Sequence, residues 1–250
     1  MALCPHAVAF AGWLAVTLPA YAIVIRSIVG HRLGFGLACA FPPVLANAMI
    51  GQNGYVTAAL LGGALHLMER RPALSGLLLG LLAYKPHFGL LIPLVLAVGG
   101  RWRVSVWAAL TGALLVALSW AAFGWASWEA FAHALPLASH AVLTQGRGDF
   151  TKVHSAFGLV RTPGGSEILA WSLQAAVIAA SGAPVCVLWR TRAAFELKTA
   201  ALAAATLLVT PYLYVYDLVV LAVPMAFLIG LGRNGGSGGA KCRPWSAPAC

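Results

Sequence analysis

Acidic residues are scarce in this 250-residue chain, which holds only six Asp and Glu residues against 16 Lys and Arg residues. Charged residues of both signs make up 9% of the sequence, whereas a soluble domain carries about 25%. The five cysteines show neither CxxC spacing nor any other spacing typical of metal ligands. The composition therefore argues against a soluble protein, and we expect no metal and no cofactor.

Long apolar stretches take the place of the missing charge. Apolar residues make up 61% of the chain, and the mean hydropathy is +0.86. A helix that spans a bilayer needs about 20 apolar residues, and uncharged windows near or above that length are Ala7–Ile25, Leu33–Met68, Val104–Phe123, Ile168–Leu188 and Thr199–Tyr216. We predict an all-α polytopic membrane protein: a single transmembrane domain over residues 1–232, with an outer loop at about 124–166, and a polar, Gly-rich, disordered tail over 233–250.

The net charge of +10 comes from basic residues in short connections between the apolar windows. Such clusters are typical of cytoplasmic loops, which are enriched in Lys and Arg. They do not form the basic stripe with interleaved aromatic residues that nucleic-acid binding favours. We therefore expect a lipid bilayer as a partner and no nucleic acid. The clusters are Arg26/Arg32, Arg70/Arg71, Arg101/Arg103, Arg190/Arg192/Lys198 and Arg233/Lys241/Arg243.

Three of the apolar spans have basic residues at both ends and a polar motif in the middle. This pattern predicts three short, in part re-entrant, helical hairpins whose polar tips point away from the cytoplasm. The arms of the second hairpin, Leu74–Tyr84 and Phe88–Gly100, reach only about 16–20 Å, less than a hydrocarbon core of about 30 Å. We expect the tips to line a cavity, because exposed backbone is not tolerated in lipid. The tips are "GQNG" (Gly51–Gly54), "YKPH" (Tyr84–His87) and "TPYLYVYD" (Thr210–Asp217).

The outer loop begins after a predicted outward crossing, Val104–Phe123, and ends before a return crossing, Ile168–Leu188. Its first part, "WASWEAFAHALPLASHAVL", has the aromatic and apolar content of an amphipathic helix that lies at the membrane interface. This helix would cover residues 125–143.

Lys85 and His87 are the most conspicuous polar residues, because a cation in mid-membrane is costly and usually functional. One interpretation is a snorkelling or helix-capping role. The other is an anion site, in which Lys85 binds a phosphate next to free helix-end amides. Gln52 and Asn53 are open to two interpretations as well: they cap the helix that begins near Tyr55, or they bind sugar hydroxyls.

Asp217 is the most interesting of the few carboxylates, because it follows Tyr212, Tyr214 and Tyr216 at a hairpin tip. It is either an interfacial carboxylate beside an aromatic belt or, together with Tyr214, a residue at the mouth of the cavity. Asp217 is a weak candidate for a catalytic base.

The segment "FPPVLANAMIGQNGYVTAALLGGALHLMERRPALSGLLLGLLAYKPHFGLLIPLVLAVGGRWR" resembles the central region of glycosyltransferase family 87. "TPYLYVYDLVVLAVP" resembles a later segment of that family, so the likeness covers roughly residues 7–228. The resemblance implies a GT-C-like helical bundle in a bacterial plasma membrane. It also implies inverting transfer of a hexose, usually mannose, from a polyprenyl-phosphate carrier to a glycolipid or glycan acceptor outside the cytoplasm.

The resemblance also implies roles for single residues. Lys85 and His87 would bind the carrier phosphate, and Gln52, Asn53 and Tyr214 would contact substrate. The family's catalytic aspartate is expected in an outer loop after the first helix, whereas residues 1–16 resemble the family's third helix. We therefore expect a chain truncated at its N-terminus. The alternative is a non-catalytic membrane protein, either an inactive fragment of such an enzyme or a transporter of an anionic lipid.

Overall fold

The computed structural model describes residues 5–145 and 150–236, and in these ranges the chain is helical without a β-strand. The α-helices are α1 (His6–Val29), α2 (Leu33–Ala40), α3 (Pro42–Ile50), α4 (Gly54–Leu67), α5 (Pro72–Leu81), α6 (Ile92–Val98), α7 (Trp102–Ser139), α8 (Ala156–Arg161), α9 (Glu167–Arg190), α10 (Phe195–Val209) and α11 (Ala222–Gly236). Short 3₁₀ or π turns are η1 (Leu82–Tyr84), η2 (Pro86–Gly89), η3 (His140–Thr144), η4 (Phe150–Lys152) and η5 (Val215–Leu221). The predicted all-α class is confirmed.

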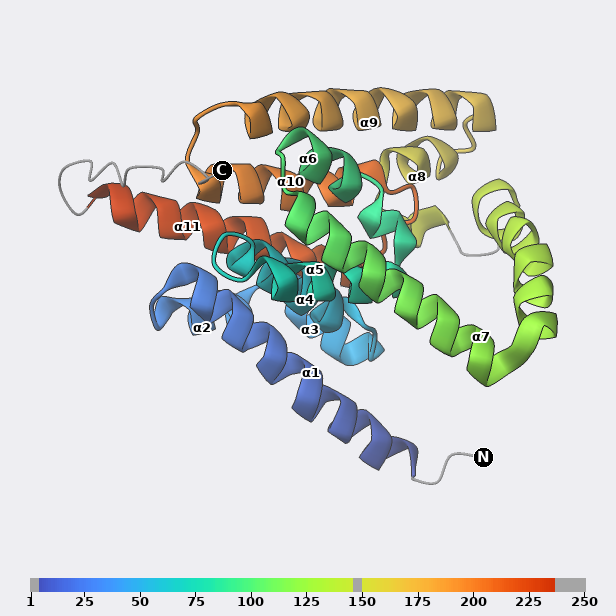
Figure 1. The fold of residues 1–250 in the computed structure, drawn as a ribbon. Helices are drawn as coiled ribbons and strands as arrows, with labels where there is room; N and C mark the ends of the chain where they lie inside the picture. The colour runs from blue at the N-terminus through green and yellow to red at the C-terminus, as the bar shows by residue number, and fades with distance from the viewer. Residues whose placement is uncertain (1–4, 146–149, 237–250) are drawn as a thin grey trace.

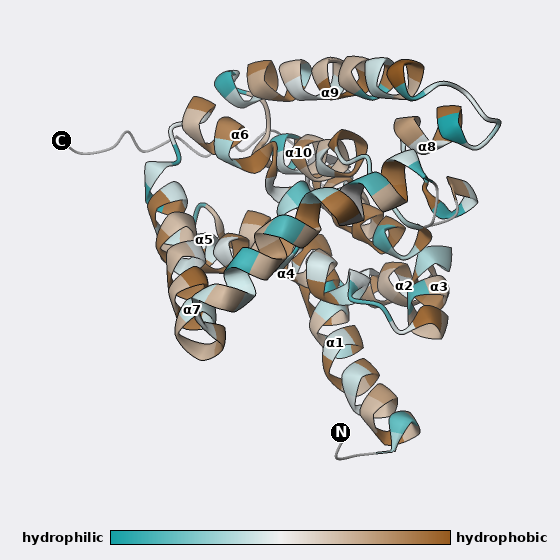
Figure 2. Ribbon diagram, turned by 90° about the vertical axis from the view of Figure 1, so that its right-hand side faces the viewer, coloured by the Kyte–Doolittle hydropathy of each residue, from teal (hydrophilic) through white to brown (hydrophobic). Residues whose placement is uncertain are grey.

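Among the described residues, four helical segments are long and apolar enough to cross a membrane, or five if the pair α2–α3, bent by 54°, is counted as one crossing. Large apolar side chains such as Leu110, Leu114 and Leu118 point outward from α7 and are more than half exposed. Figure 2 shows apolar residues along the outer helices α1, α7 and α9. A water-soluble protein does not expose apolar surface on this scale, and the chain is a polytopic membrane protein. The four segments are His6–Val29, Trp102–Thr144, Glu167–Arg190 and Val215–Arg233.

The centre of the bundle is formed by α4 and α10. Tyr55 and Leu61 of α4 and Leu202 of α10 are fully buried. Around them, α1 and α5 pack on α4, whereas α9 and α11 pack on α10. In Figure 1, α9 lies along the upper edge of the molecule with α10 below it, and α1 lies along the lower edge. This arrangement leaves the polar ends of α4 and α10 inside the molecule.

Small residues bring α5 and α7 into close contact. Gly76 and Gly80 form a GxxxG pair on α5. A Cβ atom at Gly76 would lie 2.5 Å from the Val104 carbonyl oxygen, and one at Gly80 would lie 2.7 Å from the Ala108 carbonyl oxygen. Two helix backbones approach this closely only where side chains are absent, which is how membrane helices often pack. The glycines therefore fix α5 against α7.

The three predicted polar tips lie at turns between helices. Gly51–Gly54 separates α3 from α4, Tyr84–His87 separates α5 from α6, and Thr210–Asp217 separates α10 from α11. The arms of the second predicted hairpin do not lie side by side. Helix α5 packs on α4 and α7, whereas α6 packs chiefly on α9 and α7. The hairpin is thus opened, because α5 is held by α4 and α6 is held by α9, while α7 contacts both arms.

Helix α7 continues beyond the predicted crossing and bends at Gly124, whose φ of 74° and ψ of 172° are not helical. Glycine adopts such a conformation without steric cost. Figure 1 shows the sharp bend and the second part of α7 that follows it. The second part is helical to Ser139, which agrees with the predicted helix after the crossing. Helix α11 extends to Gly236, and the rest of the predicted tail lies outside the described residues.

Candidate functional site

The three polar tips converge on one place in the fold. A Cβ atom at Gly54 would lie 2.4 Å from the backbone oxygen of Tyr216, so the first and third tips are in contact. The hydroxyl of Tyr84, in the second tip, lies 2.6 Å from the hydroxyl of Thr57, one turn into α4. Lys85 reaches Asp217 in the third tip. Side chains that the sequence separates by more than a hundred residues therefore form one polar cluster.

Lys85 and Asp217 form the charged centre of this cluster. The Lys85 Nζ atom donates to the Asp217 Oδ1 atom at 2.5 Å, and the two residues are only 7% and 1% exposed. The ammonium also lies 5.5 Å from the ring centre of Phe88 and 5.1 Å from that of Tyr216. Aromatic faces attract a cation, so the site stabilises positive charge from several sides.

The burial of Asp217 contradicts one of its two interpretations. A carboxylate at the membrane interface would be exposed, so the interfacial interpretation is wrong. Its second oxygen, Oδ2, accepts from the backbone N–H of Tyr214 at 3.4 Å. Asp217 therefore points back toward its own turn and toward Lys85. Tyr214 stacks on Tyr216, with ring centres 5.6 Å apart.

His87 lies against the third tip as well. Its ring centre is 6.1 Å from that of Tyr212 and 5.1 Å from that of Phe88. The Nε2 atom of His87 is buried and has no hydrogen-bond partner. A buried polar atom without a partner is costly, and such an atom beside a buried cation is suited to bind a polar group of a ligand.

Gln52 and Asn53 take different positions at the first tip. Gln52 is exposed, whereas the Oδ1 atom of Asn53 is buried without a hydrogen-bond partner. Neither side chain caps α4, because the side chain at the N-cap position, Asn53, makes no capping hydrogen bond. The N–H of Gly54 instead donates to Asn47 Oδ1 at 3.1 Å. The capping interpretation is therefore wrong.

Sequence reasoning missed Asn47, which is fully buried in α3. Its side chain has one bonded atom, Oδ1, and one buried atom without a partner, Nδ2. The signal was present in the sequence, because Asn47 is the only strongly polar side chain between Arg32 and Gln52. From the sequence alone, Asn47 is a polar residue in the middle of an apolar run, and nothing shows that its side chain reaches the turn before α4.

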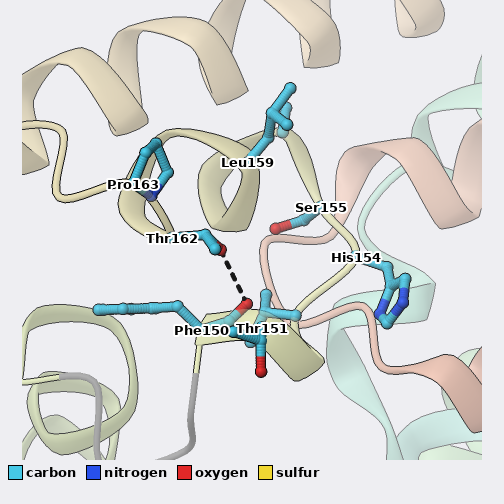
Figure 3. A pocket seen from close by; sticks show the side chains of 9 residues that line it. Phe150, Thr151, His154, Ser155, Leu159, Thr162 and Pro163 are labelled. Atoms are coloured by element: carbon cyan, nitrogen blue, oxygen red, sulfur yellow. Dashed lines mark hydrogen bonds between the residues drawn. The ribbon is translucent and has the colours of Figure 1, made fainter.

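Residues 150–163, which belong to the predicted outer loop and are called the outer segment below, pack beside the third tip. The Ser155 hydroxyl donates to the Pro211 carbonyl at 2.8 Å, and the His154 N–H donates to the Leu213 carbonyl at 2.6 Å. An open groove of about 660 Å³ runs along this segment. Figure 3 shows the side chains that line it and the hydrogen bond from Thr162 to the Phe150 carbonyl. The residues that line the groove thus come from the outer segment, and two of them, His154 and Ser155, bond to the third tip.

Comparison with protein-family models gives one match, to glycosyltransferase family 87, over residues 1–211. The match includes the first and second tips with Gln52, Asn53, Lys85 and His87, and it ends at Pro211, before Tyr214 and Asp217. No curated protein and no solved structure matches the chain.

Proposed function

Because the chain belongs to glycosyltransferase family 87, we propose that it transfers a hexose, with mannose as the first sugar to test. The donor is a polyprenyl-phosphate sugar, and the acceptor is a hydroxyl of a glycolipid or glycan outside the cytoplasm. The enzyme is a multi-pass protein of a bacterial plasma membrane with a GT-C-like bundle. The observation that supports this proposal most is the buried cation Lys85 in a cluster of polar turns.

The reaction joins an acceptor oxygen to the anomeric carbon of the sugar. The bond between that carbon and a phosphate oxygen breaks, and the polyprenyl phosphate leaves with the bonding electrons. A base takes the proton of the acceptor hydroxyl. Because negative charge builds up on the departing phosphate, a positioned cation lowers the energy of the transition state. Lys85 supplies that cation.

The neighbouring residues fit the remaining tasks of binding. His87 Nε2 is free to bond a phosphate oxygen, and Asn53 Oδ1 is free to accept from a sugar hydroxyl. Gln52 is exposed beside Asn53 and offers a further donor and acceptor. Tyr214 adds an aromatic face at the third tip. Asp217 remains a weak candidate for the base.

Turnover by the full chain in lipid nanodiscs tests the proposal. Radiolabelled polyprenyl-phosphate mannose serves as donor, and lipid extracts of bacterial membranes supply acceptors. We expect label in a product lipid, and we expect Lys85→Met to lower the rate by about 100-fold or more. Arg103→Met, which removes an exposed cation, is the matched control and keeps the rate. Unchanged turnover in Lys85→Met would contradict the assigned role of Lys85.

The ion pair also supports a second candidate function. A lysine that is already neutralised by Asp217 and nearly excluded from solvent fits a structural contact. The chain would then be a non-catalytic membrane protein, either an inactive relative of the enzymes or a transporter of an anionic lipid. Binding of the polyprenyl-phosphate sugar without any turnover, in every acceptor extract, would favour this alternative.

A further inference from the structure

The protein itself supplies the counter-ion of Lys85. The Nζ atom lies 2.5 Å from Asp217 Oδ1, and both side chains are more than nine-tenths buried. A buried charge requires a partner because it has lost its hydration. The site that we assign to the carrier phosphate therefore already holds an oxygen anion in this conformation.

The ammonium of Lys85 can bind a phosphate in place of this carboxylate. An ammonium binds oxygen anions as a point charge and does not require the planar, two-pronged geometry of a guanidinium. The other neighbours of the cation, the rings of Phe88 and Tyr216, carry no charge. Among the described residues, the other ion pair is Arg101–Glu69, which is partly exposed and involves neither residue of this site.

The segment that carries Asp217 is turn η5, which lies directly before α11. It is a 3₁₀ helix of seven residues, and 3₁₀ runs longer than 3–4 residues are uncommon. The hydrogen bond from Tyr214 N–H to Asp217 Oδ2 is long, at 3.4 Å. Just upstream, the carbonyls of Pro211 and Leu213 accept bonds of 2.8 and 2.6 Å from the outer segment. Residues 211–213 are thus bonded to the outer segment. The backbone N–H of Asp217 donates to the Tyr214 carbonyl at 2.9 Å, whereas its carboxylate is held chiefly by Lys85.

From these observations we propose that Asp217 occupies the place of the donor phosphate on Lys85, and that donor binding exchanges the carboxylate for the phosphate and releases turn η5. The inference rests on the proposed function, which assigns Lys85 to the phosphate. It gives Asp217 a positioning role: the carboxylate holds Lys85 in place and balances its charge when the site is empty, and it competes with the ligand. The apparent affinity is then lower than the intrinsic one by the fraction of Lys85 that is unpaired.

Two measurements on the full chain in detergent test whether the phosphate replaces the carboxylate on Lys85. The probe is a short-chain polyprenyl monophosphate, and the corresponding polyprenol is the control without phosphate. The first compares dissociation constants of the wild type and variants by native mass spectrometry. We expect Asp217→Asn to bind the monophosphate about tenfold or more tightly than the wild type. Glu69→Gln, which breaks the other ion pair, is the matched control and leaves the affinity unchanged.

The second measurement needs no variant. Hydrogen exchange of the amides in Val215–Leu221 is followed in the wild type with and without the probe. We expect faster exchange with the monophosphate and no change with the polyprenol. If the monophosphate binds and these amides remain as protected as before, the replacement of the carboxylate by the phosphate is refuted. This conclusion does not depend on whether Asp217→Asn folds.

The outcomes separate this inference from the proposed function. If a well-folded Asp217→Asn variant binds the monophosphate as strongly as the wild type or more weakly, the replacement of the carboxylate is overturned, but Lys85 remains the phosphate ligand. If Lys85→Met binds the monophosphate as strongly as the wild type, the proposed role of Lys85 is overturned, and the replacement with it. The charge swap Lys85→Asp/Asp217→Lys keeps an ion pair, so we expect it to fold and to lose phosphate binding.

Discussion

Lys85 and Asp217, which are 132 positions apart in the sequence, form a buried ion pair 2.5 Å long that joins the turn after α5 to the turn before α11. Both partners are almost entirely excluded from solvent. The pair therefore connects two of the three polar tips, and its removal has consequences for stability as well as for binding.

Loss of one partner should destabilise the protein more than loss of both. Lys85→Met leaves the Asp217 carboxylate buried without a counter-ion, which costs about 3–5 kcal/mol of unfolding free energy. In Lys85→Met/Asp217→Leu, neither charge remains, and we expect most of the loss to be recovered. Chemical denaturation in detergent gives the four free energies of this double-mutant cycle. Additive effects of the two substitutions would show that the side chains do not interact.

The contact between α5 and α7 should not tolerate side chains at its glycines. A Cβ atom at Gly80 would lie 2.4 Å from Thr111 Cβ and 2.7 Å from the Ala108 carbonyl oxygen. We expect Gly80→Ala to lower the unfolding free energy by about 1–3 kcal/mol, as overpacking does. Gly112→Ala on α7 is the control, because a Cβ atom there has no neighbour within 4 Å. Thermal denaturation compares the stability of Gly80→Ala with that of Gly112→Ala. Equal stability of the two variants would show that α5 and α7 lie further apart at Gly80 than in this structure.

Asn47 should matter for stability, and Gln52 should not. Asn47→Ala removes the acceptor of the buried Gly54 N–H, and a buried donor without a partner costs about 1–3 kcal/mol. Gln52→Ala removes an exposed side chain, and we expect a change within about 0.5 kcal/mol. Denaturation midpoints in detergent check both. A stable Asn47→Ala variant would mean that the first tip is held by other contacts.

Arg161 should hold the outer segment together. Its Nη1 and Nη2 atoms donate to the carbonyls of Gly165 and Thr144, both at 2.8 Å, and its guanidinium lies over the Phe150 ring. Lysine lacks the planar fork that makes these contacts at once. We expect Arg161→Lys to raise hydrogen exchange in residues 150–163 by about tenfold, which corresponds to about 1.4 kcal/mol.

Arg190→Lys, at the exposed C-terminal end of α9, is the control for Arg161. It changes the same residue type where no such set of contacts is present, and it should leave the exchange of residues 150–163 unaltered. Equal protection in Arg161→Lys and in the wild type would show that the guanidinium does not hold this segment.

Membrane orientation can be tested by labelling. The basic clusters predict that Arg71 faces the cytoplasm and Thr162 the outside. In a background without the native cysteines, Thr162→Cys in intact cells should react with an impermeant maleimide, and Arg71→Cys should react only after the cells are opened. The reverse pattern would invert the topology and place the polar cluster on the wrong side for the proposed donor.

Much of the architecture followed from local patterns. Length and apolarity of the windows predicted the all-α membrane class, and the polar motifs at Gly51–Gly54, Tyr84–His87 and Thr210–Asp217 marked turns that the structure contains. The family was identified from the same motifs. Of the two interpretations of Gln52 and Asn53, the capping role is wrong, because the acceptor for the first amide of α4 comes from Asn47 in the preceding helix.

What the sequence alone determined is the class of protein, the family and the presence of polar groups that a bilayer would not tolerate without partners. Those properties depend on composition and on residues close together in the chain. Only the tertiary structure decided that the three tips meet, that α4 holds one arm of the second hairpin and α9 the other, and that Lys85 is paired with Asp217. These relations depend on helix packing, for example on the contact that Gly76 and Gly80 of α5 make with α7. No local pattern specifies which distant carboxylate a buried cation will reach.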